Sequence, residues 1–219
     1  MAEPDSVTEA YRHCEALVRA HDKDHYLTSL FAPAERRRYL FALYAFALEI
    51  GRVKAAVTEP MTGVIRLQWW LEAVTGLRAA EAAASPVMIA LQDAGQQTNV
   101  ALAPLAAAIA ARQGELEGTP ASGEAAVLFV MAARFLGAEI GSVDDVAGAA
   151  AQAVDADDRQ QARAAYVTFR ARAATVPESA LPAFLPVALV PLLLKNPGAP
   201  QWRRQIALAR AAWFGFPKL

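Results

Sequence analysis

Between Tyr39 and Val57, apolar residues occupy nearly every position of the sequence YLFALYAFALEIGRVKAAV. A helix with this pattern has no broad polar face, so other elements must cover most of its sides. Apolar residues recur at helical spacing along nearly all of the remaining chain, and no strand-like alternation persists beyond a few residues. The sequence therefore predicts an all-α fold in which this helix is buried.

Composition agrees with one helical domain spanning residues 1–219. Apolar residues make up 55% of the chain and charged residues 20%, which is typical of packed helices. The formal net charge of −1 gives no strong field toward nucleic acid, so we expect no nucleic-acid partner. Cys14 is the only cysteine, which excludes an internal disulfide and a cysteine-based zinc site.

Capping residues and prolines divide the chain into segments. We expect Ser6 and Ser142 to cap helices, a polar break at residues 21–25, a bend at Pro104 and a loop at residues 114–123. The expected helices cover residues 6–20, 33–57, 60–78, 86 onward, 124–139, 142–154, 157–174, 181–194 and 201–214.

Two segments bear on the location of the protein. Residues 1–8 have no basic start and no apolar stretch, so we expect no leader peptide and a cytoplasmic location. The longest apolar run, residues 181–194, is short and contains three prolines, so we expect no transmembrane segment.

The buried helix contains three charges, Glu49, Arg52 and Lys54. Glu49 and Arg52 stand three residues apart and therefore share one side of the helix. Two interpretations are open: a buried, self-satisfied ion pair, or charges that line a pocket.

The following helix contains the sequence GVIRLQWWLEAV, with Arg66, Gln68, Trp69 and Trp70. Gln68 can pair with a glutamate one turn later, and Arg66 is a candidate anion-binding residue. Adjacent tryptophans point in different directions on a helix, so one can pack inward while the other faces a partner. Trp69, Trp70 and Trp213 are the candidate partner surface.

A family resemblance rests on residues 21–74. The residues that support it, in order, are Ala45-Phe46, Glu49, Arg52, Glu59-Pro60, Gly63 and Ile65-Arg66-Leu67-Gln68-Trp69-Trp70. This order resembles the squalene/phytoene synthase family. It is most similar to a branch that includes a mitochondrial assembly factor of respiratory complex I.

The resemblance implies an isoprenoid-synthase-like helical bundle around a central cavity, here shortened in the middle. Catalytic members join two prenyl diphosphates and neutralise the leaving diphosphate with Mg²⁺ held by Asp-x-x-x-Asp pairs. Such pairs place two carboxylates on one helix face. No Asp-x-x-x-Asp occurs in this sequence, and the helix expected to carry the first pair has Glu49, Gly51, Arg52, Val53 and Lys54 instead.

Three other clusters are weaker candidates. His21 and His25 have a spacing that can bind a metal on a helix, although a solvated turn is the simpler interpretation. An acidic group at residues 155–158 precedes a helix and complements its dipole. The run Arg36 to Arg38 can contact phosphate or an acidic partner, but such runs usually form a solvated face.

These observations predict a non-catalytic protein that binds a protein partner or an isoprenoid ligand, with no metal or other cofactor. The resemblance adds a role in complex I assembly and peripheral contact with the inner membrane. The alternative is a prenyl diphosphate transferase in which Glu49 and scattered acids replace the aspartate pairs and hold Mg²⁺. A third interpretation is a degenerate copy without function.

Overall fold

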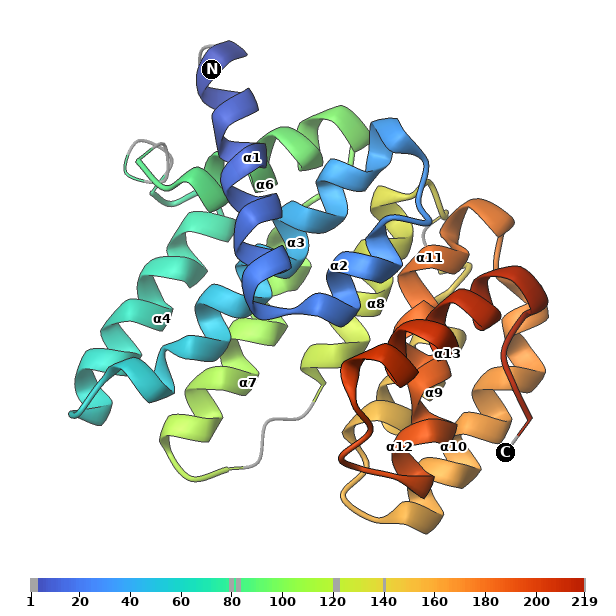
Figure 1. Ribbon diagram of the computed structural model, residues 1–219. Helices are drawn as coiled ribbons and strands as arrows, with labels where there is room; N and C mark the ends of the chain where they lie inside the picture. The colour runs from blue at the N-terminus through green and yellow to red at the C-terminus, as the bar shows by residue number, and fades with distance from the viewer. Residues whose placement is uncertain (1–3, 79–80, 82–83, 120–122, 140, 219) are drawn as a thin grey trace.

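The computed structural model describes residues 4–78, 81, 84–119, 123–139 and 141–218, and every regular element within them is a helix (Figure 1). The α-helices are α1 (Pro4–His21), α2 (Lys23–Ser29), α3 (Ala34–Arg52), α4 (Pro60–Val74), α6 (Pro86–Thr98), α7 (Ala106–Leu116), α8 (Glu124–Phe135), α9 (Asp144–Asp155), α10 (Arg159–Arg172), α11 (Leu181–Phe184), α12 (Val190–Lys195) and α13 (Gln201–Phe214). The 3₁₀ turns are η1 (Lys54–Ala56), η2 (Ala103–Leu105), η3 (Ala173–Thr175), η4 (Glu178–Ala180) and η5 (Leu185–Leu189).

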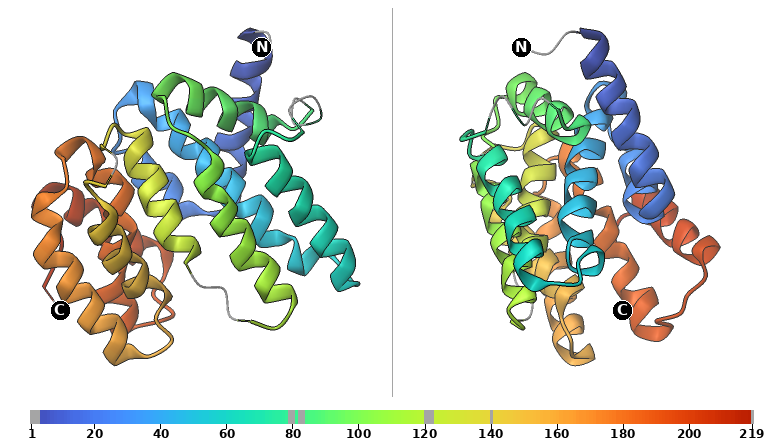
Figure 2. Two further views of the ribbon diagram at one scale, coloured as in Figure 1. Left: turned by 180° about the vertical axis from the view of Figure 1, so that it is seen from behind. Right: turned by 90° about the vertical axis from the view of Figure 1, so that its left-hand side faces the viewer.

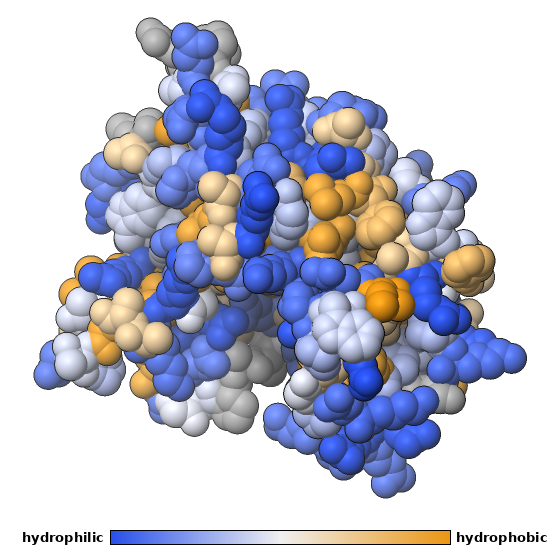
Figure 3. All heavy atoms as spheres, in the orientation of Figure 1, coloured by the Kyte–Doolittle hydropathy of each residue, from blue (hydrophilic) through white to orange (hydrophobic). Residues whose placement is uncertain are grey.

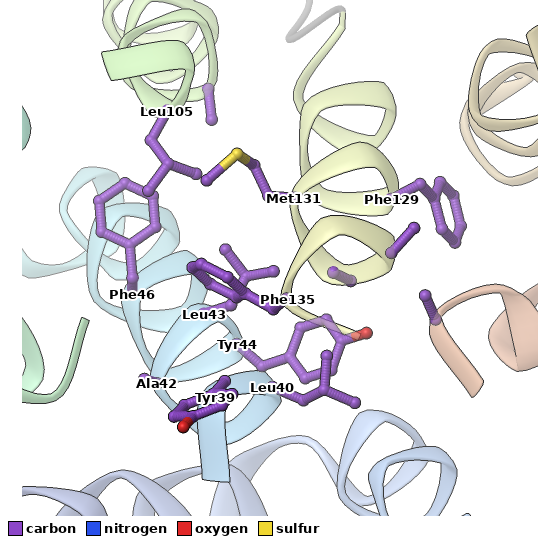
Figure 4. Packing of buried hydrophobic residues seen from close by; sticks show 14 of the residues in the cluster. Tyr39, Leu40, Ala42, Leu43, Tyr44, Phe46, Leu105, Phe129, Met131 and Phe135 are labelled. Carbon is purple, nitrogen blue, oxygen red and sulfur yellow. The ribbon is translucent and has the colours of Figure 1, made fainter. Parts of the chain in front are cut away.

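Helix α3 is the buried helix that the sequence predicts. It packs against α1, α6 and α8, which surround it on several sides. Figure 4 shows side chains of α3, including Leu43 and Phe46, directed toward Met131 and Phe135 of α8. All four of these side chains are fully buried. The centre of the hydrophobic core therefore lies between α3 and α8.

Helices α4 and α7 pack side by side next to this core (Figure 1). Their approach is close because Gly63 faces Leu116: a Cβ atom at position 63 would lie 2.8 Å from a Leu116 methyl group. A larger residue at position 63 would push the two helices apart. This contact sets the position of α4 and of the tryptophans on it.

The C-terminal part consists of α9 and α10, which pack together, and of α11 to α13 (Figure 2). Helix α13 lies over η5 and also contacts α2. A small second core of Leu185, Ala188 and Ala211, with Phe216 against it, joins α13 to η5. One side of α13 is therefore covered, and the other faces outward.

The observed helix ends correct several expectations. Helix α1 begins at Pro4, so Ser6 lies inside it and does not cap it. Asp22 caps α2 by accepting a hydrogen bond from the backbone N–H of His25 at 3.0 Å. The break expected at residues 21–25 is therefore limited to Asp22, and the residues on both sides of it are helical. Ser142 does not cap α9, because its hydroxyl donates to the carbonyl oxygen of Glu139.

Helices α3, α4 and α8 end earlier than expected, at Arg52, Val74 and Phe135 instead of residues 57, 78 and 139, and a left-handed residue follows α4 and α6. The chain leaves α4 after Val74, and Gly76 follows with φ = 84°. Helix α6 ends at Thr98 and is capped by Asn99, which has φ = 53°, so there is no single helix that bends at Pro104. In the predicted loop at residues 114–123, α7 continues to Leu116, and residues 120–122 lie outside the described residues.

The apolar run near the C-terminus is divided by its prolines into α11, η5 and α12, as short helical pieces. By length and composition alone, one helical stretch, Glu178–Lys195, is long and apolar enough to cross a membrane. This stretch is longer than the run of residues 181–194 that was considered too short from the sequence. More than half of it, 56%, is buried inside the protein, as is usual for a core segment.

The arginine run at the start of α3 is not the solvated face that was expected. Arg36 donates to the carbonyl oxygen of Phe135 at 3.2 Å, and Arg37 donates to carbonyl oxygens of the turn after α2. The Arg38 guanidinium lies 4.9 Å from the ring centroid of Tyr11. These cations therefore hold α3 to its neighbours.

Candidate functional site

Five of the residues singled out from the sequence come together at the junction of α3 and α4. They line a pocket of about 190 Å³, which we call the α4 pocket. Its lining residues are Glu49, Arg52, Val53, Ala56, Arg66, Trp69 and Trp70. The pocket combines two guanidinium groups with an aromatic wall, a combination suited to an anionic or aromatic group of a partner.

The two charges on α3 are not a buried ion pair. The Arg52 Nη1 and Glu49 Oε1 atoms are 4.0 Å apart, and the side chains are 39% and 38% exposed. Of the two interpretations drawn from the sequence, the structure therefore supports the pocket-lining one. At this distance and exposure the pair contributes little to folding, so both groups can interact with an outside molecule.

The adjacent tryptophans differ in burial, as their positions on a helix predict. Trp70 is 8% exposed and packs edge-to-face on Phe46, with ring centroids 5.6 Å apart. Trp69 is half-buried and packs edge-to-face on Trp70 at 5.0 Å. Trp70 is therefore a core residue and is withdrawn from the candidate partner surface, whereas Trp69 forms the accessible wall.

The remaining sequence candidates lie outside the α4 pocket. Lys54 is exposed on η1 and is absent from the lining. The Gln68 side chain donates to Glu72 Oε1 at 2.9 Å, which confirms the expected pairing but places Gln68 on the outer face of α4. Trp213 lies on α13 and is 80% exposed, in a different part of the molecule (Figure 1).

A second, central pocket of about 390 Å³ was not predicted residue by residue. It lies where α2, α3, α7, α8, α9 and η5 meet. The residues around it are His25, Tyr44, Arg112, Glu124, Ala125, Leu128, Phe129, Val154, Asp155 and Pro186. Apolar walls with a few converging polar groups are typical of ligand sites.

The charged centre of this pocket is Arg112. Its Nη1 donates to Glu115 Oε2 at 2.8 Å, and its Nη2 lies 2.6 Å from Glu124 Oε2. Burial raises the pKa of the Glu124 carboxyl, and the Arg112 guanidinium opposes that rise. The same Nη2 lies 3.5 Å from the position of a Cβ on Gly51. Arg112 therefore lies against the helix that was expected to carry the first aspartate pair.

Two further polar groups face the pocket from α2 and α3. His25 Nδ1 is 2.7 Å from Asp22 Oδ2, and its ring packs on Tyr44 with centroids 4.2 Å apart. Tyr44 is buried, and its hydroxyl has no hydrogen-bond partner among the described residues. Burial, and to a smaller extent the charge of Asp22, raises the pKa of Tyr44 above its usual value of 10.0, so the hydroxyl remains a donor at neutral pH.

Sequence features that could have indicated this pocket are few. Arg112 is the only cation in the apolar run of α7, and Glu124 is the only carboxylate at the start of the apolar helix α8. Each has an ordinary explanation when considered singly. Only the packing of α7 on α8 shows that the two are partners.

The described residues do not fit a Mg²⁺–diphosphate site. They contain no group of three or more His, Cys, Asp or Glu side chains placed to bind a metal ion. That finding covers the His21–His25 spacing, the acidic group at residues 155–158 and the scattered set around Glu49. Moreover, the lining of the central pocket has two carboxylates, Glu124 and Asp155, and one arginine, a balance of charge that does not favour a diphosphate.

Comparison with known proteins identifies relatives for part of the chain. Residues 18–154 match the family described as squalene/phytoene synthase. The protein called NADH dehydrogenase (ubiquinone) complex I, assembly factor 6, of Bos taurus is 37% identical over 89 residues, which is 41% of this chain and 27% of the bovine protein. The Homo sapiens protein of that name is 38% identical over 88 residues, which is 40% of this chain and 26% of the human protein.

The homologue in Drosophila melanogaster is 39% identical over 64 residues, covering 29% of this chain and 19% of the fly protein. The matched stretch thus spans about a quarter or less of the length of these curated relatives. No solved structure matches the chain. The family match covers more than half of the sequence, from the end of α1 to the end of α9. The chain belongs to the squalene/phytoene synthase family.

Proposed function

We propose that this chain is a non-catalytic member of its family that acts by binding, in the assembly of respiratory complex I. The names of the bovine, human and fly relatives support the assembly role. The observation that carries the non-catalytic part is the position of Arg112, which lies over Gly51 and binds two glutamates. A cation of the protein itself thus pairs with carboxylates beside the helix on which the family resemblance places the first Mg²⁺-binding motif.

The α4 pocket is the proposed contact surface for a protein partner. It lies within the matched residues 18–154, and it exposes Arg52, Arg66 and the edge of Trp69. Arginine and tryptophan are the residue types that most often dominate protein interfaces. The partner segment that fits is acidic or aromatic, because it meets two guanidinium groups beside an indole ring.

We place the protein in the cytoplasm, in peripheral contact with the inner membrane, and without a metal cofactor. The complex named by the relatives uses ubiquinone, a lipid-soluble substrate, so an assembly factor for it works near a membrane. Because peripheral contact is reversible, the protein can dissociate from the complex once assembly is complete.

The test is complementation in cells from which the gene has been removed. Membranes of these cells should lose NADH:ubiquinone reductase activity and assembled complex I on native gels, and the wild-type chain should restore both. A chain with Arg66→Glu and Trp69→Ala should restore neither while folding normally. Ile65→Ala, an exposed change on the same helix, is the matched control. Normal complex I in the deleted cells would contradict the proposal.

A second candidate function is the binding of an uncharged isoprenoid in the central pocket. Tyr44 favours it, because its hydroxyl has no hydrogen-bond partner among the described residues and its side chain lines the pocket between apolar walls. Farnesol should raise the melting temperature of the protein, whereas farnesyl diphosphate should not, because the pocket carries an excess of carboxylates. Tyr44→Phe should reduce the farnesol effect; an equal effect of alcohol and diphosphate would contradict this assignment.

A further inference from the structure

The outer face of α13 carries the most exposed aromatic side chains among the described residues. Trp202, Ile206 and Trp213 follow one another at spacings of four and seven residues, so they form a single stripe along the helix. Their exposed fractions are 56%, 51% and 80%, and Phe214 beside them is 86% exposed. Figure 3 shows the face that carries α13, with apolar and pale side chains standing among hydrophilic ones.

Contacts on the opposite side of α13 hold this stripe outward. Arg204 forms an ion pair with Asp24, a buried carboxylate of α2, and the Gln201 side chain donates to the same carboxylate at 3.0 Å. Leu208 and Ala211 are buried, and Ala211 belongs to the small core against η5. Helix α13 therefore cannot rotate to hide its tryptophans without breaking a buried ion pair.

The chain segment that carries the stripe has a positive net charge. Residues 179–219 contain no Asp or Glu and five basic residues, whereas the first 178 residues carry a formal net charge of −6. Arg203 and Arg210 border the stripe and are exposed, and the Arg203 guanidinium lies 5.1 Å from the Trp202 ring centroid. The overall net charge of −1 is therefore the sum of an acidic N-terminal part and a basic C-terminal segment.

We propose that α13 docks the protein on an anionic lipid surface, with the axis of the helix parallel to the surface. An apolar stripe with tryptophans, bordered by arginines and free of acidic groups, is what helices that lie in the membrane interface present. The tryptophans and Phe214 enter the boundary between headgroups and acyl chains, and Arg203 and Arg210 contact lipid phosphates. This inference rests on the peripheral location proposed above and names its surface and its lipid chemistry.

Vesicle co-sedimentation tests the proposal, with vesicles of phosphatidylcholine alone and vesicles mixed in equal parts with phosphatidylglycerol. The wild-type chain should bind the anionic vesicles preferentially, and added salt should weaken the binding. Trp213→Ala should weaken binding roughly tenfold through the lost apolar contact, and the combined change of Arg203→Ala and Arg210→Ala about 25-fold. Ile65→Ala on α4 should have no effect. Unchanged melting temperatures show that each variant folds.

Binding that survives both α13 variants would overturn the proposal, and so would equal binding to neutral and anionic vesicles. It is likewise overturned if the wild-type chain ignores vesicles but self-associates in sedimentation, with Trp213→Ala abolishing the self-association, because the face then pairs with a second copy. Complementation with Trp213→Ala separates the two proposals: a variant that loses vesicle binding but restores complex I leaves the assembly role standing.

Discussion

Tryptophan and arginine occur together at two places in this molecule, the α4 pocket and the outer face of α13, and the two places differ in how they are covered. On α4, Trp70 is sealed against Phe46 of α3, so the aromatic pair forms the wall of a small cavity. On α13, Trp202 and Trp213 have no helix over them among the described residues and project from the surface. The α4 pocket lies within the family match, whereas α13 lies beyond it.

The comparison teaches that residue type does not decide between a recognition pocket and a flat surface. At α4, the end of α3 and the turn η1 after it supply the second wall of the pocket. At α13, the Arg204–Asp24 ion pair commits the opposite face of the helix to the core. The first arrangement suits a single protruding side chain of a partner, and the second suits an extended, deformable surface.

The largest expected difference between the two regions concerns their tryptophans. Trp70→Ala removes a buried indole from the core and should lower the free energy of unfolding by about 3–5 kcal/mol. Trp213→Ala, its matched control, should change that free energy by less than about 0.5 kcal/mol, because the side chain is exposed. Urea denaturation measures both changes. Equal losses of unfolding free energy in the two variants would contradict the conclusion that Trp70 is buried and Trp213 is exposed.

A smaller effect is expected for the arginines of α13. Arg204→Met leaves the Asp24 carboxylate buried without its cation and should cost about 3 kcal/mol. Arg203→Met, one position away and exposed, should cost less than about 0.5 kcal/mol. Hydrogen exchange of α13 should accelerate only in the first variant. If the two variants behave alike, the ion pair does not set the rotation of α13.

The contribution of Asp22, which caps the helix α2 that α13 contacts, to the free energy of unfolding should depend on pH. Burial would raise the pKa of Asp22, but the hydrogen bond and charge of His25, with a contribution from Arg204, lower it below 3.8. The carboxylate therefore stabilises the folded state above pH 3.8, and this contribution disappears as the pH falls through the lowered pKa. Asp22→Asn, which keeps the helix cap, should cost about 1–2 kcal/mol at pH 5. Denaturation curves at pH 5 and below pH 3 should show this cost shrinking; a constant cost would contradict the assignment.

The smallest effect is expected at the mouth of the α4 pocket. Arg52→Ala should lower the free energy of unfolding by about 0–1 kcal/mol, because the Glu49 pair is long and partly exposed. The same variant should still impair complementation if the pocket binds a partner. A loss comparable to that of Trp70→Ala in urea denaturation would show that Arg52 supports the core instead.

Much of the helical arrangement is predictable from apolar spacing. The pattern of α3 requires burial on most sides, and α13 has the bounds that its sequence predicts, Gln201–Phe214. Boundaries were less predictable where one residue decides the path of the chain. Asp22 separates α1 from α2 by a cap, and Asn99 ends α6 by a left-handed turn that its sequence does not require.

The α4 pocket and the central pocket also differ in how far they could be predicted from the sequence. The α4 pocket joins residues close in sequence, so helical spacing sufficed to group Glu49 with Arg52 and Arg66 with Trp69 and Trp70. The central pocket joins His25 to Pro186 through six elements, and no local spacing relates them. The burial of the Glu49–Arg52 pair was also undetermined, because whether a charge on an apolar helix reaches solvent depends on where the neighbouring helices end.

Isothermal titration with farnesyl diphosphate, with and without Mg²⁺ and followed by product analysis, tests the central claim most directly. The account predicts no Mg²⁺-dependent heat and no prenyl product, because Arg112 pairs with the acidic side chains of the central pocket and the described residues contain no group of three or more His, Cys, Asp or Glu placed to bind a metal ion. Mg²⁺-dependent binding with turnover to a condensed product would contradict it and establish a prenyltransferase.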